Sequence, residues 1–113
     1  MLDVVEGFWL VQYEGMAGNG GGVVVFLKGK VYGGDSGSTY LGAYQTNGKE
    51  LRSTVKVHNY MPGVVSAIGL QQDDYELQIV GSVEGAIIKA SGTPIGQKVA
   101  GLALKLTRVT KFE

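Results

Sequence analysis

The strongest constraint on this chain is a period-two alternation of apolar and polar residues in short runs, with a turn signal about every ten residues. In residues 51–60, for example, Leu51, Val55 and Val57 alternate with polar side chains. One face of this segment is therefore expected to meet a core and the other to meet water. No segment has the period of a long amphipathic helix. The pattern is typical of a small antiparallel β-protein.

The expected elements follow from this alternation and from the glycine-rich turns. Strands are expected at residues 7–14, 23–27, 30–32, 38–45, 51–60, 75–84, 86–91 and 102–107. Loops are expected at 15–22, 33–37 and 92–96, and one short helical turn at 64–70. Asn47-Gly48 predicts a hairpin with a type I′ turn, in which both central residues have positive φ.

About eight short antiparallel strands in 113 residues are best accommodated by a single all-β domain over residues 1–113. We expect an up-and-down, lipocalin-like barrel, because closure leaves no unpaired edge strand; an open sandwich is the alternative. The interior of such a barrel is either packed with side chains or holds one small ligand. If it is hollow, the expected lining residues are Trp9, Val11, Tyr13, Val55, Val57 and Leu77.

Composition excludes several classes of function. Ten basic and ten acidic residues cancel, so the chain lacks the positive field that nucleic-acid or anionic-membrane binding normally needs. Cysteine is absent, which excludes disulfides and thiol catalysis. The first residues lack the pattern of a signal peptide, and no later stretch is long and apolar enough for a transmembrane helix. We expect a cytoplasmic protein with no cofactor, no metal and no direct contact with nucleic acid or membrane.

No motif assembles a catalytic site. Residues 34–37, Gly-Asp-Ser-Gly, are similar to the nucleophile segment of chymotrypsin-like proteases, but the single histidine, His58, lies on a strand face expected to meet solvent. We expect a turn there. Gly18-x-Gly20 begins like a phosphate-binding loop, yet a valine-rich strand follows it instead of a helix. The adjacent Asp73 and Asp74 would point in different directions on an extended chain. The chain is therefore not expected to be an enzyme.

Glycine and aromatic positions carry a resemblance to a known family. They are Gly7-Phe8-Trp9 with Tyr13, Gly29, Gly33-Gly34-Asp35, Tyr40-x-Gly42 and Val55 to Tyr60. In order and approximate spacing they resemble the GrlR-type negative regulators of type III secretion, small bacterial proteins with a lipocalin-like barrel. Gly7-x-Trp9 is also similar to the motif that opens the first lipocalin strand, where the indole closes one end of the barrel. The resemblance covers roughly residues 6–80 and implies a dimeric, cytoplasmic, noncatalytic regulator of transcription.

The resemblance also implies a loop that binds a protein partner. The best-known family member restrains a transcriptional activator through acidic residues on an exposed loop. The corresponding residues here are Thr46, Asn47, Gly48, Lys49 and Glu50. Only Glu50 is acidic and Lys49 has the opposite charge, so the charge complementarity that would attract a basic activator is absent.

Two functions stay open. Residues 23–27 are apolar on both faces, so an outer face needs cover from residues 64–70 or from a second subunit. We expect Val24 and Phe26 at such a homodimer surface. A dimeric protein that regulates another protein is the first hypothesis. The alternative is a lipocalin-like carrier or sensor that holds an apolar small molecule in its barrel.

Overall fold

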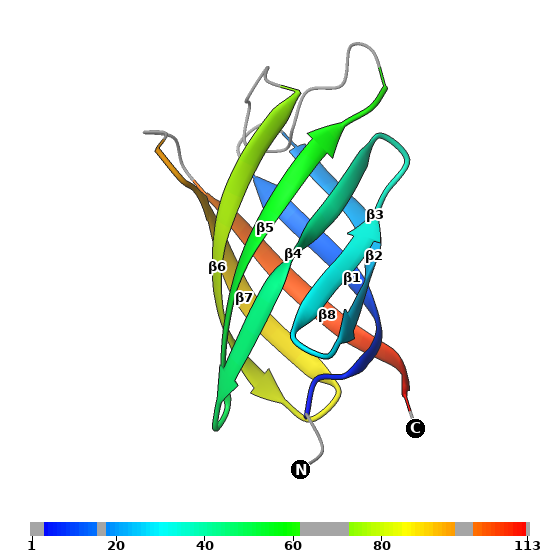
Figure 1. Ribbon diagram of the computed structural model, residues 1–113, viewed down its shortest axis with the longest axis vertical. Helices are drawn as coiled ribbons and strands as arrows, with labels where there is room; N and C mark the ends of the chain where they lie inside the picture. Colours follow the sequence, from blue (N-terminus) through cyan, green and yellow to red (C-terminus); the bar gives the residue numbers. More distant parts are fainter. Residues whose placement is uncertain (1–3, 16–17, 62–72, 97–100, 113) are drawn as a thin grey trace.

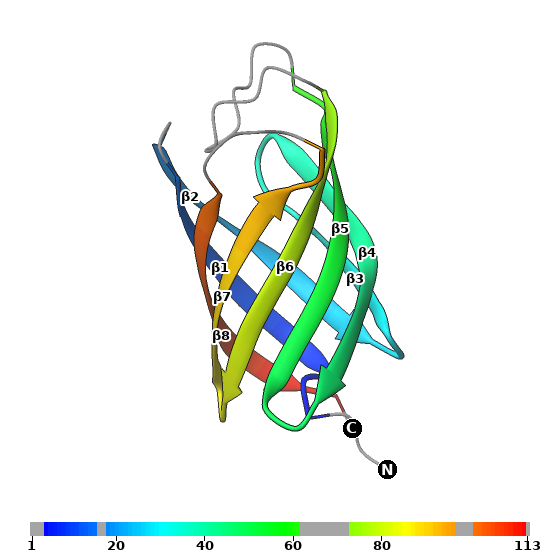
Figure 2. The same cartoon turned by 90° about the vertical axis from the view of Figure 1, so that its left-hand side faces the viewer.

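The computed structural model describes residues 4–15, 18–61, 73–96 and 101–112, and these form one closed, antiparallel, eight-stranded β-barrel. The strands follow chain order around the barrel, and the last pairs with the first (Figures 1 and 2). Their bounds are β1 (Gly7–Gly15), β2 (Gly18–Leu27), β3 (Lys30–Gly34), β4 (Ser38–Asn47), β5 (Glu50–Asn59), β6 (Asp74–Glu84), β7 (Ile87–Pro94) and β8 (Leu102–Lys111). The expected all-β, lipocalin-like barrel is confirmed, and the open sandwich is excluded.

Alternation of burial along the strands gives the barrel its interior. In β5 every second residue is buried, including Leu51, Val55 and Val57, while the residues between them are exposed. The same alternation continues on the neighbouring strand, where Val55 pairs with Leu77. Because the side-chain period of a strand is two, this register places the apolar rows of neighbouring strands on the same inner face.

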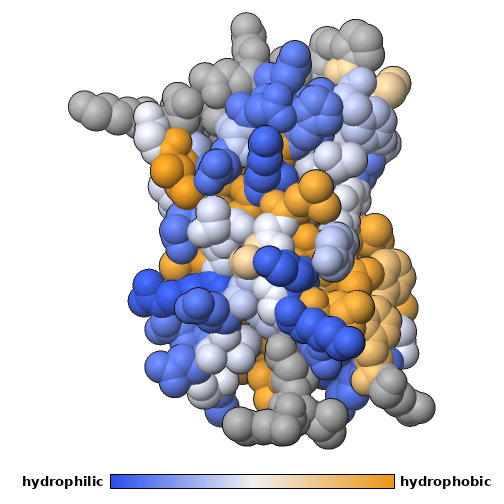
Figure 3. Space-filling view, in the orientation of Figure 1, coloured by the Kyte–Doolittle hydropathy of each residue, from blue (hydrophilic) through white to orange (hydrophobic). Residues whose placement is uncertain are grey.

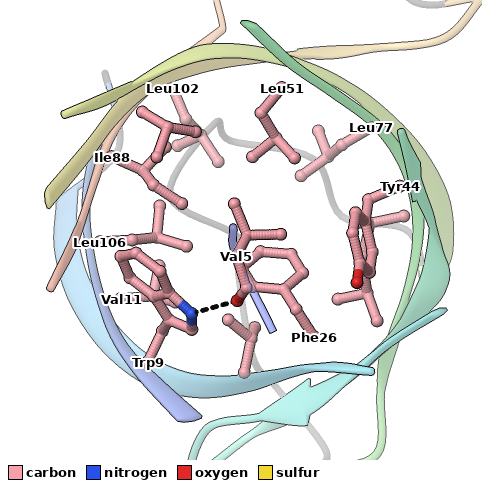
Figure 4. Close-up of a cluster of buried hydrophobic side chains, with 14 of the residues drawn as sticks. Val5, Trp9, Val11, Phe26, Tyr44, Leu51, Leu77, Ile88, Leu102 and Leu106 are labelled. Carbon is pink, nitrogen blue, oxygen red and sulfur yellow. Dashed lines mark hydrogen bonds between the residues drawn. The ribbon is translucent and has the colours of Figure 1, made fainter. Parts of the chain in front are cut away.

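One end of the barrel is closed by packing around Trp9. The indole is fully buried, and its Nε1 donates a hydrogen bond to the backbone carbonyl of Val5 at 2.8 Å (Figure 4). Phe26 packs edge-on against it, with ring centroids 6.1 Å apart. On the other side the Arg108 guanidinium lies 4.6 Å from the centroid of the indole and donates to the carbonyl of Val4. Val4 and Val5, which precede β1, are thereby fixed at this end of the barrel.

Three segments expected to be loops are strands over part of their length. Residues 33 and 34, expected in the loop at 33–37, belong to β3 and pair with β2 and β4. The β1–β2 pairing continues to Gly15 and Gly18, so residues 18–22 extend β2 instead of forming a loop. Residues 92–94 likewise belong to β7 and pair with β6. Glycine and proline are poor strand formers, but here pairing with a neighbouring strand overrides that local preference. The expected helical turn at 64–70 lies outside the described residues.

The β4–β5 hairpin turn differs in type from the sequence expectation. Asn47 ends β4, so Gly48 and Lys49 are the central residues of the β4–β5 turn. Only Gly48 has positive φ, at 62°, which fits a type II′ turn and not type I′. The β2–β3 turn has positive φ at both Lys28 and Gly29, at 49° and 80°, and this is the type I′ pattern.

The outer surface of β2 also differs from expectation. Val24 and Phe26, expected at a dimer surface, are only 6% and 3% exposed and point into the barrel. Trp9 pairs with Val24 across the β1–β2 ladder, and paired residues share a face of the sheet, so the inward row of β1 fixes an inward row on β2. The outward residues of this part of β2 are instead Val23, Val25 and Leu27.

Candidate functional site

A cavity of about 470 Å³ occupies the barrel interior. Ligand pockets in proteins commonly measure roughly 300–1,000 Å³, so this space is large enough for one small molecule. Its wall is mainly aliphatic, with valine, leucine and isoleucine side chains from β1, β2, β3, β5, β6 and β8. Of the residues expected to line such a space, the structure places these on the wall: Val11, Tyr13, Val55, Val57 and Leu77.

Trp9 is the expected lining residue that does not reach the cavity. Its side chain has no exposed surface and belongs to the packing that closes the barrel, beside Phe26. Figure 4 shows Trp9 directed toward Val5, at the centre of the ring of strands. Trp9 is therefore a structural residue of the closed end.

The polar part of the cavity is centred on Asp35, which directly follows β3. The Oδ2 atom of Asp35 accepts hydrogen bonds from the hydroxyls of Tyr13, at 2.9 Å, and Tyr40. Its Oδ1 accepts the backbone N–H of Gly37 at 2.9 Å. Outside the cavity lining, the hydroxyl of Tyr60 donates to the backbone carbonyl of Asp35 at 2.9 Å. These contacts fix the carboxylate at the end of the cavity opposite Trp9.

The protease-like segment at residues 34–37 forms a turn and not a nucleophile site. The N–H of Asp35 donates to the carbonyl of Ser38 at 2.9 Å, which closes the turn. His58 lies elsewhere, on the outer face of β5, where its Nδ1 is 2.9 Å from Oδ1 of Asp74. In the described part of the chain, no three His, Cys, Asp or Glu side chains gather as a metal site.

Asp35, Tyr13 and Tyr40 together form what we call the Asp35 cluster. Glycines of β2 create the space for it. A Cβ atom at Gly20 would lie 2.5 Å from the hydroxyl oxygen of Tyr13, the residue with which Gly20 pairs. A Cβ atom at Gly22 would lie 2.7 Å from the carbonyl oxygen of Gly34 and 3.0 Å from the hydroxyl of Tyr40. The glycine run, read from sequence as a loop, is therefore a strand that leaves room for two tyrosine side chains.

Burial raises the pKa of both tyrosines of the cluster. Burial and, next, the hydrogen bond to Asp35 raise the pKa of Tyr13 from its ordinary value of 10.0 to about 12. The same causes, again with burial first, raise the pKa of Tyr40 further. A phenolate beside a carboxylate in a poorly solvated space would be doubly unfavourable. Both hydroxyls are neutral donors to the Asp35 carboxylate at neutral pH, and the raised pKa values extend this state into alkaline pH.

The expected partner-binding hairpin lies at the other end of the barrel (Figure 1). It joins β4 to β5, and β4 runs away from the Asp35 cluster toward the closed end. All of its residues are exposed: Thr46, Asn47, Gly48, Lys49 and Glu50. Glu50 forms an ion pair with Arg52 at 2.5 Å, so the one acidic side chain of the hairpin already has a cationic neighbour. None of these five residues lines the cavity.

An apolar row crosses the outer face of four neighbouring strands. Phe8 of β1 pairs with Val25 of β2, which pairs with Tyr32 of β3, which pairs with Leu41 of β4. Tyr32 and Leu41 are 49% and 54% exposed. Apolar side chains gather on the right of Figure 3, where β1, β2 and β3 lie in the matching view. This surface, which we call the outer apolar row, was missed from sequence because it depends on strand register.

Comparison with known proteins finds no family model and no curated protein that matches the chain. Among the described residues, no helix is long and apolar enough to cross a bilayer. The functional proposals below therefore depend on the cavity, the Asp35 cluster, the exposed hairpin and the outer apolar row.

Proposed function

We propose that this protein binds a small, largely apolar molecule inside its barrel, as a carrier or sensor. The observation that carries the proposal is the cavity of about 470 Å³, which is aliphatic over most of its wall and polar at the Asp35 end. Ligand sites typically combine an apolar wall with a few polar groups that orient the ligand. The cavity has both parts.

The closed end of the barrel supports the same proposal. Val5 and Trp9 are fully buried there and do not line the cavity, so one end of the barrel is packed and the space for a ligand lies above it. A ligand that removes the aliphatic wall from water would be favoured by the hydrophobic effect.

Binding of a neutral fluorescent probe, N-phenylnaphthylamine, tests the proposal directly. A Val55→Phe substitution adds a ring on the cavity wall, so we expect probe affinity to fall at least about tenfold, because overfilling removes the ligand's space. Thr54→Phe is the matched control, since Thr54 is exposed on the outer face of the same strand. Circular dichroism reports whether both variants keep the β-fold.

The result that contradicts the proposal is equally clear. If the wild-type protein binds neither the probe nor any of a panel of apolar molecules, the barrel is not a carrier or sensor. Equal loss of binding in Val55→Phe and Thr54→Phe would place the probe outside the cavity. Indole fluorescence is a poor reporter here, because Trp9 does not line the cavity.

A second function is favoured by a different observation, the outer apolar row. We propose that the chain forms a cytoplasmic homodimer through this row and regulates another protein, as its resemblance to GrlR-type regulators of type III secretion implies. Exposed apolar surface on a sheet is typical of an interaction site, and a two-fold axis lets one such row pack against its own copy. In this proposal Val25, Tyr32 and Leu41 take the place expected for Val24 and Phe26.

Affinity capture from the native cell lysate tests the regulatory proposal. The tagged wild-type protein is compared with a Lys49→Glu, Glu50→Lys variant, which exchanges the two charges of the hairpin and keeps the net charge. A transcriptional activator captured in stoichiometric amount by the wild type, and lost by the variant, is the expected result. Recovery of the protein without a partner counts against regulation by contact.

A further inference from the structure

We infer that the cavity selects apolar molecules with a protonated amine as head group and discriminates against carboxylates. The head group would lie at Asp35, between the hydroxyls of Tyr13 and Tyr40, and the apolar body would lie against the aliphatic wall. This inference rests on the proposed binding function and specifies the chemical class of its ligand.

The charge of the cavity is the first step. Among the described residues that line it, Asp35 is the one charged side chain, and the lining holds no lysine, arginine or histidine. No ion pair joins Asp35 to another described residue. A carboxylate ligand would meet this negative charge without a cation beside it, whereas an ammonium group would neutralise it.

The direction of the hydrogen bonds is the second step. The hydroxyls of Tyr13 and Tyr40 both donate to Asp35, so their protons are not available to a ligand. Both phenols are protonated at neutral pH, and their raised pKa values extend this arrangement into alkaline pH. A hydroxyl that donates still has lone pairs, and a carboxylate offers about four acceptor positions. The cluster therefore presents acceptors to the cavity.

Two of the three serines of the lining show the same polarity, and the third, Ser36, is exposed. The hydroxyl of Ser38 donates to Oδ1 of Asn59 at 2.5 Å, and the hydroxyl of Ser53 donates to the carbonyl of Ala43 at 2.7 Å. Both serines are buried, and their protons are committed to protein acceptors. A carboxylate needs donors, which the two tyrosine hydroxyls of the Asp35 cluster and these two serine hydroxyls do not offer. An ammonium group brings three N–H donors and needs acceptors.

Isothermal titration calorimetry at neutral pH with decylamine, decanol and decanoate tests the inference, because the three share one apolar chain. For the wild type we expect decylamine to bind at least about tenfold more tightly than decanoate, with decanol between them, since hydrogen bonds to a charged group are the stronger ones. In Asp35→Asn the ratio between decylamine and decanoate should fall to about one. Glu84→Gln removes an exposed carboxylate at the β6–β7 turn and should keep the wild-type ratio.

The outcomes separate this inference from the function on which it rests. If none of the three molecules binds, the proposed binding function fails and the inference with it. If decanoate binds as tightly as decylamine, or if Asp35→Asn keeps the preference, apolar binding stands and the amine site is wrong. Should Asp35→Asn fail to fold, the wild-type ratio of decylamine to decanoate decides the question by itself.

Discussion

At the scale of single residues, Trp9 shows how one side chain can fix an end of the barrel. Its indole has no exposed surface, donates to the carbonyl of Val5 and lies under the Arg108 guanidinium. Gly7, two residues earlier, has φ of 152°, and a Cβ atom there would lie 2.4 Å from the carbonyl oxygen of Thr110. The Gly-x-Trp pattern is therefore explained by close approach of β8 and by burial of the indole.

Replacement of Trp9 by phenylalanine should destabilise the fold. The smaller ring leaves the carbonyl of Val5 without its donor and leaves a void beside Phe26, so we expect a loss of about 1–3 kcal/mol in the free energy of unfolding. Urea unfolding followed by circular dichroism measures it. Val109→Ala, at an exposed position on β8, is the control and should change stability by less than about 0.5 kcal/mol. Equal stability of the wild type and Trp9→Phe would show that the closed end contributes little.

The tyrosines of the Asp35 cluster predict a loss of stability at alkaline pH. Tyr13 has a pKa of 10.0 when unfolded and about 12 when folded, so below pH 10 both states hold the proton and its contribution is fully present. Between pH 10 and 12 the unfolded state releases the proton first, and the contribution is lost. Tyr13→Phe and Tyr40→Phe should lose less stability in this window than the wild type. Tyr32→Phe, outside the cavity, should follow the wild type; identical pH profiles for all four proteins would contradict the prediction.

At the scale of elements, the two halves of β2 differ in the size of their side chains. Its first half is glycine-rich and faces the tyrosine cluster, whereas its second half carries Val24 and Phe26 into the core. The change from glycine to large side chains along one strand accompanies the change from the polar end of the cavity to the packed end of the barrel. Residue size in a single strand therefore helps to set where the cavity lies.

A double-mutant cycle tests this role of the glycines. Gly20→Ala should destabilise the protein by about 1–3 kcal/mol, because the new methyl group overlaps the ring of Tyr13, whose nearest atoms lie 2.5–2.7 Å away. In a Tyr13→Ala background that overlap is absent, and the cost of Gly20→Ala should fall to below about 1 kcal/mol. Chemical denaturation of the four proteins gives the coupling energy. Additive losses would mean that Gly20 does not act through Tyr13.

The sequence predicted the strands well where side chains alternate, as in β5, and poorly where they do not. Glycine has no side chain to alternate, so residues 18–22 carried no strand signal although they pair fully with β1. The link between Tyr13 and Asp35 joins residues on β1 and after β3, and only the barrel register brings them together. Five expected lining residues followed from alternation, but the position of Trp9 below the cavity depended on how the chain before β1 packs.

At the scale of the whole molecule, the features proposed for function occupy separate places. The Asp35 cluster lies at one end of the barrel, the hairpin at residues 46–50 at the other, and the outer apolar row on the side wall. A ligand in the cavity could change partner binding only if it favoured one conformation of the barrel over another. β4 links the three places, since it carries Tyr40 in the cluster, Leu41 in the row and the first half of the hairpin.

Dimer formation is the prediction that belongs to this scale. If the outer apolar row is the subunit interface, Leu41→Glu places a charge where two copies meet, and sedimentation velocity at high micromolar concentration should show the wild type as a dimer and the variant as a monomer. Val80→Glu is the control, because Val80 is also exposed but lies on β6, outside the row, and should leave the dimer intact. A monomeric wild type would remove the dimer from the regulatory proposal. It would leave the proposal of ligand binding untouched, because the outer apolar row lies on the outside of the strands and the cavity lies inside them.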